Sequence, residues 1–159
     1  MMNNRQRAAR SLKSRALGYL SRREYSRLEL ARKLAPFAEH EAAGALDALL
    51  DALEQAGWLS DARFTESVVH RQSARLGANR IINELKRHAV DDALIENVSA
   101  RLRETELARA QAVWQKKYGQ LPVTPRECAA QARFLAARGF SSGIIVKILK
   151  GLDEDWIQE

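Results

Sequence analysis

Cysteine and helix-breaking residues are scarce in this chain of 159 residues, and each shortage excludes a class of structure. Cys128 is the only cysteine, so no disulfide can form within the chain, which favours the reducing cytosol. Only three prolines and eight glycines interrupt it, which favours helix. No stretch approaches the roughly 18 apolar residues of a membrane span, and no apolar run follows the charged N-terminal residues as in a signal peptide. We therefore expect a soluble, cytoplasmic protein without a membrane partner.

Sequence patterns of catalytic and metal sites are also missing. The chain has no GxxxxGK(S/T) phosphate-binding loop, no HExxH zinc motif and no GxSxG nucleophile motif. His40, His70 and His88 have no metal-ligand spacing to one another or to Cys128. The adjacent residues Asp91-Asp92 are better explained as a helix cap than as a metal pair. We expect a protein that is not an enzyme and that uses no metal and no cofactor.

Basic residues outnumber acidic ones, and their distribution is uneven. The formal net charge is +6, from 26 Lys and Arg against 20 Asp and Glu. Residues 1–33 hold ten basic residues against Glu24 and Glu29, whereas residues 153–159 hold four acidic residues and no basic one. The excess of positive charge favours an anionic partner. The basic end is as consistent with a solvated tail as with a polyanion contact.

Hydrophobic residues recur at the helical period, and no segment alternates convincingly at the period of a strand. The fold class that we expect is all-α, with about nine short helices. Gly57 suits the left-handed position that ends a helix, and Gly77 suits the end of the helix after it. The predicted helices occupy residues 11–21, 26–35, 42–56, 60–76, 78–89, 91–102, 107–118, 124–138 and 141–150.

Two regions that lie 50 positions apart have similar sequences. Residues 85–95, LKRHAVDDALI, align with residues 135–145, LAARGFSSGII. A weaker similarity joins residues 27–34 to residues 78–85. We therefore expect an elongated tandem array of three three-helix repeats. The predicted boundaries are a basic tail over residues 1–10, repeats over 11–57, 58–103 and 104–151, and an acidic tail over 152–159.

Residues 25–36, YSRLELARKLAP, carry strong signals for both ends of a short helix. Ser26 can cap the N-terminus while the side chain of Glu29 reaches back to the N–H of the cap, and Tyr25 and Leu30 have the spacing of a hydrophobic staple. Pro36 prevents continuation. A helix of about three turns is marginal alone. We therefore interpret these signals as structural, in the middle helix of the first repeat.

Several residues of mixed character are predicted to lie in the core. Cys128 is four residues from Ala132 and seven from Leu135, on one helical face, so it is predicted to be a small core residue. Aromatic side chains do not alternate with basic ones as they do in platforms that stack single-stranded nucleic acid. They stand beside caps or on apolar stripes, and five of them are predicted to be buried: Tyr25, Trp58, Phe64, Trp114 and Phe140.

Nine basic residues at helical spacings are the candidate binding residues. Lys and Arg on one helical face can follow phosphates or meet an acidic protein surface, although such a face is more often merely solvated. Arg71 and Arg75 are four residues apart, and Arg80 and Arg87 are a heptad apart. The full set is Arg22, Arg23, Arg27 and Lys33 around the capped helix, Arg71, Arg75, Arg80 and Arg87 in the second repeat, and Lys147 in the last helix.

Four motifs follow one another along the chain: ALGYLSRREYSRLELARKL (16–34), GWLSDARFTES (57–67), RLG with IINEL (75–85) and RFLAARGFSSGIIVKIL (133–149). In order and spacing they resemble those of one family, the RecX modulators of the bacterial RecA recombinase. The resemblance spans almost the whole chain and leaves out only the first dozen residues and the acidic end.

The resemblance implies a modular protein of three-helix repeats that binds the RecA–DNA filament in its helical groove. It further implies inhibition of RecA's ATP hydrolysis, strand exchange and coprotease activity, which tempers recombination and the SOS response. The family has no compact set of functional residues to carry over, so the nine basic residues remain a physical hypothesis. We expect a monomer that touches DNA at most through non-specific phosphate contacts. The alternative is a direct DNA-binding protein of the helix–turn–helix kind, because such units are also three short helices with basic faces.

Overall fold

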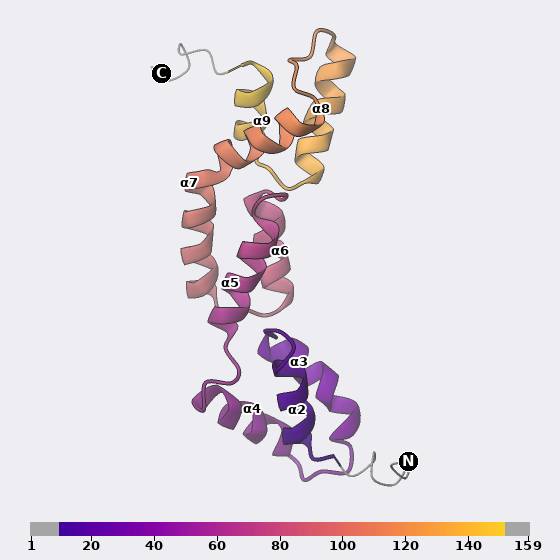
Figure 1. Ribbon diagram of the computed structural model, residues 1–159, viewed down its shortest axis with the longest axis vertical. Helices are drawn as coiled ribbons and strands as arrows, with labels where there is room; N and C mark the ends of the chain where they lie inside the picture. Colours follow the sequence, from indigo (N-terminus) through magenta and orange to yellow (C-terminus); the bar gives the residue numbers. More distant parts are fainter. Residues whose placement is uncertain (1–9, 152–159) are drawn as a thin grey trace. The chain divides into compact units, whose positions relative to one another are not determined.

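A computed structural model describes residues 10–151 of the chain (Figure 1). Almost the whole predicted basic tail and all of the acidic tail lie outside these residues. The described part contains no strand, which confirms the all-α prediction. It consists of α2 (Leu12–Leu20), α3 (Arg27–Leu34), the 3-10 helix η1 (Ala35–Phe37), α4 (Ala45–Gln55), α5 (Asp61–Gln72), α6 (Ala78–Arg87), α7 (Asp92–Lys117), α8 (Pro125–Ala137) and α9 (Ser142–Leu149).

The chain divides into two compact units, and the division falls inside α5. Unit 1 holds the chain up to Ser67 together with His88–Asp91, and unit 2 holds Val68–Arg87 and the chain from Asp92 onward. The residues between 58 and 103 are therefore shared between the units. The predicted boundaries of the three repeats remain a prediction.

Unit 1 is built on α2, α3 and α4, which pack against one another. The core is almost entirely aliphatic, since leucines at helical spacing on each helix point inward. Gly57 follows α4 with φ of +81°, which confirms the predicted left-handed position. The buried cluster consists of Leu12, Ala16, Tyr25, Leu30, Leu34, Leu50, Leu53 and Leu59.

The capped helix of residues 25–36 forms largely as predicted. Ser26 is fully buried, and its Oγ accepts a hydrogen bond of 3.1 Å from the backbone N–H of Glu29. Tyr25 and Leu30 share the core of unit 1. The carboxylate of Glu29 pairs with Arg23 instead of reaching back to the cap. The helix ends at Leu34, and Pro36 lies in the following 3-10 turn.

Unit 2 has α7 as its central element. Helix α6 packs on α7, and α9 packs on both α7 and α8 (Figure 1). The indole N–H of Trp114 donates a bond of 2.8 Å to Oε1 of Gln131, so this buried polar group is satisfied. The aliphatic and aromatic side chains that close the second half of the unit are Ala110, Trp114, Leu135, Phe140, Ile145 and Ile148.

Helix α7 is one helix of 26 residues where the sequence predicted two. The buried stripe runs without a break through Ile95, Val98, Leu102, Glu106, Ala110 and Trp114. A charged residue therefore occupies one of its positions. Glu106 is 2% exposed, and its carboxylate accepts the N–H of Ser141 at the start of α9 at 3.2 Å. Because Glu106 is charged, it interrupts the apolar pattern of the sequence although not the buried stripe itself, and the pattern alone predicts a helix boundary there.

Three further predictions are wrong. Helix α5 ends at Gln72 and not at Leu76, because Arg109 binds the carbonyls of the turn that follows. Cys128 is exposed on α8, since the buried face of that helix runs through Gln131 and Leu135. Trp58 is 58% exposed, because Leu59 takes the core position in that loop.

The internal similarity between residues 85–95 and 135–145 is reflected in matching burial. Leu85 and Leu135 are both fully buried, and Val90 and Phe140 are 5% and 3% exposed. The turns match as well, since Ala89 has φ of +53° at the position of Gly139, which has +89°. Ala89 is the one non-glycine residue with positive φ among the described residues.

Two glycines allow a close backbone crossing inside unit 2. The N–H of Gly77 donates a short hydrogen bond of 2.7 Å to the carbonyl of Arg138. A Cβ on Gly77 would overlap with the backbone of Gly139 and Phe140, and a Cβ on Gly139 would overlap with Arg80. The turn before α6 and the turn after α8 therefore meet backbone to backbone. No helix in the described part is long and apolar enough to cross a membrane.

We predict that Gly77→Ala destabilises unit 2, because the added methyl group forces apart two backbone segments. Overpacking of this kind costs about 1–3 kcal/mol. The control is Gly143→Ala, where nothing lies within 4 Å of the added Cβ. There the variant should gain up to about 1 kcal/mol from helix propensity. Urea denaturation followed by circular dichroism measures the free energy of unfolding of both variants. Equal stability would contradict the close backbone approach at Gly77.

Candidate functional site

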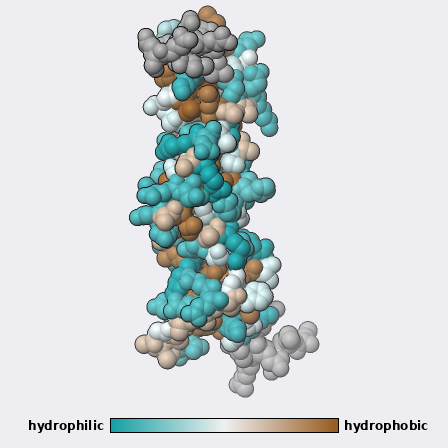
Figure 2. All heavy atoms as spheres, turned by 90° about the vertical axis from the view of Figure 1, so that its left-hand side faces the viewer, coloured by the Kyte–Doolittle hydropathy of each residue, from teal (hydrophilic) through white to brown (hydrophobic). Residues whose placement is uncertain are grey.

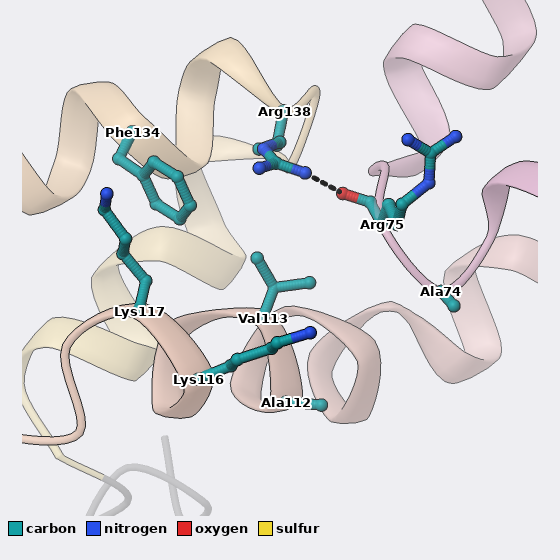
Figure 3. Close-up of a pocket in the computed structure, with 8 residues that line it drawn as sticks. All are labelled: Ala74, Arg75, Ala112, Val113, Lys116, Lys117, Phe134 and Arg138. Atoms are coloured by element: carbon teal, nitrogen blue, oxygen red, sulfur yellow. Dashed lines mark hydrogen bonds between the residues drawn. The ribbon is translucent and has the colours of Figure 1, made fainter.

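A groove with positively charged walls lies on unit 2, and we call it the cationic groove (Figure 3). It has a volume of about 470 Å³. The floor is apolar and comes from the end of α7 and from α8, while cations stand around it. No carboxylate lines it. The lining residues are Ala74, Arg75, Ala112, Val113, Lys116, Lys117, Phe134 and Arg138.

A second hollow shares Arg75 and Arg138 with the cationic groove, and we call it the polar hollow. It has a volume of about 510 Å³. Its carboxylate, Glu84, accepts a hydrogen bond of 2.7 Å from the amide of Gln72 and forms no ion pair. The lining residues are Gln72, Arg75, Leu76, Arg80, Glu84, Arg87 and Arg138.

The crossing of Gly77 and Gly139 places these arginines side by side. Arg138 caps the C-terminus of α8, and its carbonyl accepts the N–H of Gly77. Arg80, in the first turn of α6, donates to the carbonyl of Ala137 at 2.9 Å. Residues that are far apart in the sequence therefore present their charges on one surface.

Arg109 of α7 holds the turn that carries Arg75. Its guanidinium donates to the carbonyls of Ser73 and Leu76, at 2.9 and 2.7 Å, and to that of Leu102 at 2.9 Å. Burial lowers the pKa of Arg109 from its usual value, and the nearby charge of Glu106 partly offsets this. Arg109 is therefore a structural cation whose donors already have partners.

The cations of the two hollows keep their charge largely uncompensated. Among the residues that the structure describes, Arg75, Arg87 and Lys116 form no ion pair. Arg80 and Arg138 donate to backbone carbonyls, which carry no net charge. Figure 2 shows that hydrophilic side chains cover most of the face drawn there, with hydrophobic ones in small separate patches. Together the cations form a face suited to an anion.

The candidates of unit 1 are largely occupied within that unit. Arg27 contacts Asp51 at 2.7 Å and Glu54 at 3.0 Å, and hydrogen bonds to both raise its pKa. Arg23 pairs with Glu29, a bond that likewise raises the pKa of Arg23.

The remaining candidates fall into two groups. The Nζ of Lys33 lies 4.9 Å from the ring centroid of Tyr19, within the range of a cation–π contact. Arg22, Arg71 and Lys147 are exposed and line neither hollow.

The structure thus brings together three of the nine sequence candidates, Arg75, Arg80 and Arg87. It adds three cations that sequence reasoning missed, Lys116, Lys117 and Arg138. The adjacent lysines at the end of α7 are a visible signal, but they are also a normal feature of a helix C-terminus. Only the fold shows that they share a groove with Arg75.

A serine–histidine contact in unit 1 is structural. The Oγ of Ser26 lies 2.9 Å from Nδ1 of His88, and Oε2 of Glu29 lies 3.7 Å from the same nitrogen. The Ser26 hydroxyl is fully buried and already accepts the N–H of Glu29. The ring of His88 also packs on Phe64, with centroids 4.7 Å apart. Residues 10–151 contain no cluster of three or more His, Cys, Asp or Glu side chains that could hold a metal ion.

Comparison with known proteins decides the family. Models of the second and third three-helix domains of RecX match residues 60–98 and 104–149. A regulatory protein RecX from Ralstonia nicotianae is 52% identical over 143 residues, which cover 90% of this chain and 89% of that protein. The chain belongs to the RecX family. Another RecX, from Herminiimonas arsenicoxydans, is 46% identical and covers 91% of this chain and 95% of its own length.

The fold of a solved RecX structure agrees with this assignment. The crystal structure of RecX from Lactobacillus salivarius superposes with a TM-score of 0.74 at 21% identity, covering 90% of this chain and 95% of the other. At that identity the similarity establishes the fold alone. The all-helical architecture of the described residues therefore agrees with the family of regulatory proteins to which the sequence assigns the chain.

We predict that replacing Arg27 by glutamine affects mainly stability, whereas replacing Arg87 by glutamine affects mainly binding to a polyanion. Arg27→Gln should lower the free energy of unfolding by about 1 kcal/mol or less, because it breaks two solvent-accessible ion pairs. Arg87→Gln should leave stability unchanged but elute from a heparin column at lower salt, because its charge is uncompensated. Urea denaturation and heparin elution measure the two effects. If both variants had the same stability and the same elution salt, the distinction between a paired Arg27 and an unpaired Arg87 would be wrong.

Proposed function

We propose that this RecX chain binds the filament that the RecA recombinase forms on DNA and inhibits its activities. These activities are ATP hydrolysis, strand exchange and coprotease action, and their inhibition tempers recombination and the SOS response. The proposal places the chain in the cytoplasm, where it acts by binding rather than by catalysis. The observation that carries it is the family membership, at 52% identity over 90% of the chain.

The cationic face of unit 2 supports this proposal with a surface of suitable chemistry. A RecA–DNA filament presents phosphates and acidic side chains together, and both attract guanidinium groups. Among the described residues, Arg75, Arg87 and Lys116 form no ion pair with a carboxylate. Binding to an anionic partner therefore does not first have to break an internal ion pair. We take this face, rather than the paired cations of unit 1, as the contact surface.

Direct DNA binding is the second candidate, since the polar hollow alone would suit a phosphate group. Four arginines line it, and its carboxylate is bonded to an amide. The two candidates differ in what they require. A helix–turn–helix protein that acts on DNA directly should prefer certain sequences without RecA, whereas generic attraction to phosphates is weak, sensitive to salt and independent of sequence.

The first test is a titration of the chain into RecA assembled on single-stranded DNA. Substoichiometric amounts should suppress DNA-dependent ATP hydrolysis, because one bound molecule can affect more than one protomer of a filament. Electron microscopy of the same samples should show changed filament length or decoration. Unchanged hydrolysis at every ratio would refute the proposal, and sequence-dependent DNA binding without RecA would favour the alternative.

The contact surface is tested by charge reversal. We predict that Arg75→Glu combined with Arg87→Glu raises the concentration needed for half-inhibition by an order of magnitude or more, because charge-assisted contacts become repulsive. The matched control is Arg126→Glu with Arg133→Glu, which changes the net charge equally on exposed positions of α8 that line neither hollow. Equal loss in both pairs would mean that net charge, and not this face, governs binding.

A further inference from the structure

The cationic groove differs from the polar hollow in having an apolar floor. Val113 and Phe134 are half-buried at its base, with Ala112 beside them. Figure 3 shows the side chains of Val113 and Phe134 facing the same space between α7 and α8, with Lys117 and Arg138 around it. A phosphate backbone would leave such a floor uncovered. An acidic peptide segment with one or two large apolar residues would satisfy both the walls and the floor.

The ring of Phe134 is poorly placed to stack a nucleic-acid base. Nζ of Lys117 and Cζ of Arg138 lie 5.7 and 5.2 Å from its centroid, and Tyr118 packs against it edge-on with centroids 5.5 Å apart. A base that stacked on this ring would have to displace side chains of the chain itself. The groove therefore favours an acidic peptide over single-stranded nucleic acid.

A peptide of this composition is part of the same chain. Residues 152–159, LDEDWIQE, carry four carboxylates, Asp153, Glu154, Asp155 and Glu159, and no basic residue. They also contain Trp156 and Ile157, which are large enough to cover an apolar floor. The four carboxylates match the four cations of the groove in number: Arg75, Lys116, Lys117 and Arg138.

The described chain ends beside the loop that follows the lysines of the groove. A Cβ on Gly151 would lie 3.5 Å from Cδ1 of Leu121, so Gly151 stands beside Leu121. Leu121 follows Lys117 by four residues, which is at most about 14 Å of extended chain. Five residues from Gly151 to Trp156 can span up to about 17 Å, which is comparable with that separation.

We propose that residues 152–159 fold back and occupy the cationic groove of their own chain. Trp156 and Ile157 cover the apolar floor at Ala112 and Val113, and the carboxylates pair with the surrounding lysines and arginines. The segment thereby neutralises part of the cationic face and competes with any other anion that binds there. If the function proposed above holds, the segment regulates that same face. Its occupation of the groove does not depend on that function.

Paramagnetic relaxation in the full-length chain tests the contact directly. The chain carries Cys128→Ser and Gln158→Cys, so that one nitroxide label is attached in the acidic segment. The backbone amides of Ala112, Val113, Lys116 and Lys117 should lose signal intensity, more strongly than amides of α9. Uniformly unaffected amides in the groove would refute the proposal. A mixture in which label and isotope are on different molecules should show no such loss, and loss there would assign the contact to a second copy.

Charge reversal in the groove should release the segment. Lys116→Glu with Lys117→Glu should restore the lost intensity, whereas Lys86→Glu with Arg103→Glu changes the net charge equally and should not. Both control positions are exposed and line neither hollow. Loss of intensity that survives the groove reversal would place the segment elsewhere. If both pairs of substitutions restored the signal intensity, the contact would depend only on net charge and not on the groove, and the proposal would be wrong.

Competition is measured with heparin as the polyanion. Neutralising the segment by Asp153→Asn, Glu154→Gln and Asp155→Asn should move elution from heparin to higher salt. The matched control is Glu39→Gln, Glu41→Gln and Glu96→Gln, which changes the net charge by the same amount at exposed positions. Elution at equal salt for the two variants would refute competition. Neither measurement uses RecA, so failure here leaves the proposed function untouched.

Discussion

The surface of unit 2 depends on one backbone contact, the hydrogen bond from Gly77 N–H to the carbonyl of Arg138. At this point two turns approach so closely that neither Gly77 nor Gly139 has room for a side chain. Arg75 and Arg80 flank the first turn, and Arg138 belongs to the second. A contact between backbones, without any charged group, therefore determines which charges become neighbours. Arg109 supports it from α7 by binding the carbonyls of Ser73 and Leu76.

The sequence predicts the helices well where their signals are local. The cap at Ser26 and the left-handed glycine at Gly57 both appear in the structure. Such signals act within one turn, so they can be read without knowing the fold. The similarity between residues 85–95 and 135–145 succeeds for the same reason, because each segment carries its own turn and its own inward residues.

The predictions that failed depend on partners distant in the sequence. Glu106 is polar in the sequence yet buried in the structure, because the N–H of Ser141 at the start of α9 needs an acceptor. That one residue made a continuous helix look like two. Cys128 and Trp58 appeared apolar enough for the core, but other residues of their own segments hold the core positions. Residue spacing alone could not prevent either error. Each segment can bury only a few side chains, and which side chains these are depends on how the segment packs against the rest of the fold.

The candidate site also depends on partners that are distant in the sequence. The number of cations can be counted in the sequence, but whether a cation is paired with a carboxylate cannot be read from it. Arg27 and Arg87 both lie on helices rich in charge. Arg27 forms ion pairs with Asp51 and Glu54, whereas Arg87 forms none in the described part of the chain, although Glu84 lines the same hollow. Pairing requires carboxylates from another helix, which only the fold brings close.

The two adjoining hollows extend this argument from charge to partner chemistry. They share Arg75 and Arg138, so their electrostatic attraction for an anion is largely common to both. They differ in the floor, which is polar around Gln72 and Glu84 and apolar around Val113 and Phe134. Under the proposed function, charge would attract an anionic partner to this face, and the floor would decide which part of that partner can be desolvated there. A partner that offers phosphates and acidic side chains together can use both hollows at once, whereas a partner with phosphates alone can use only one.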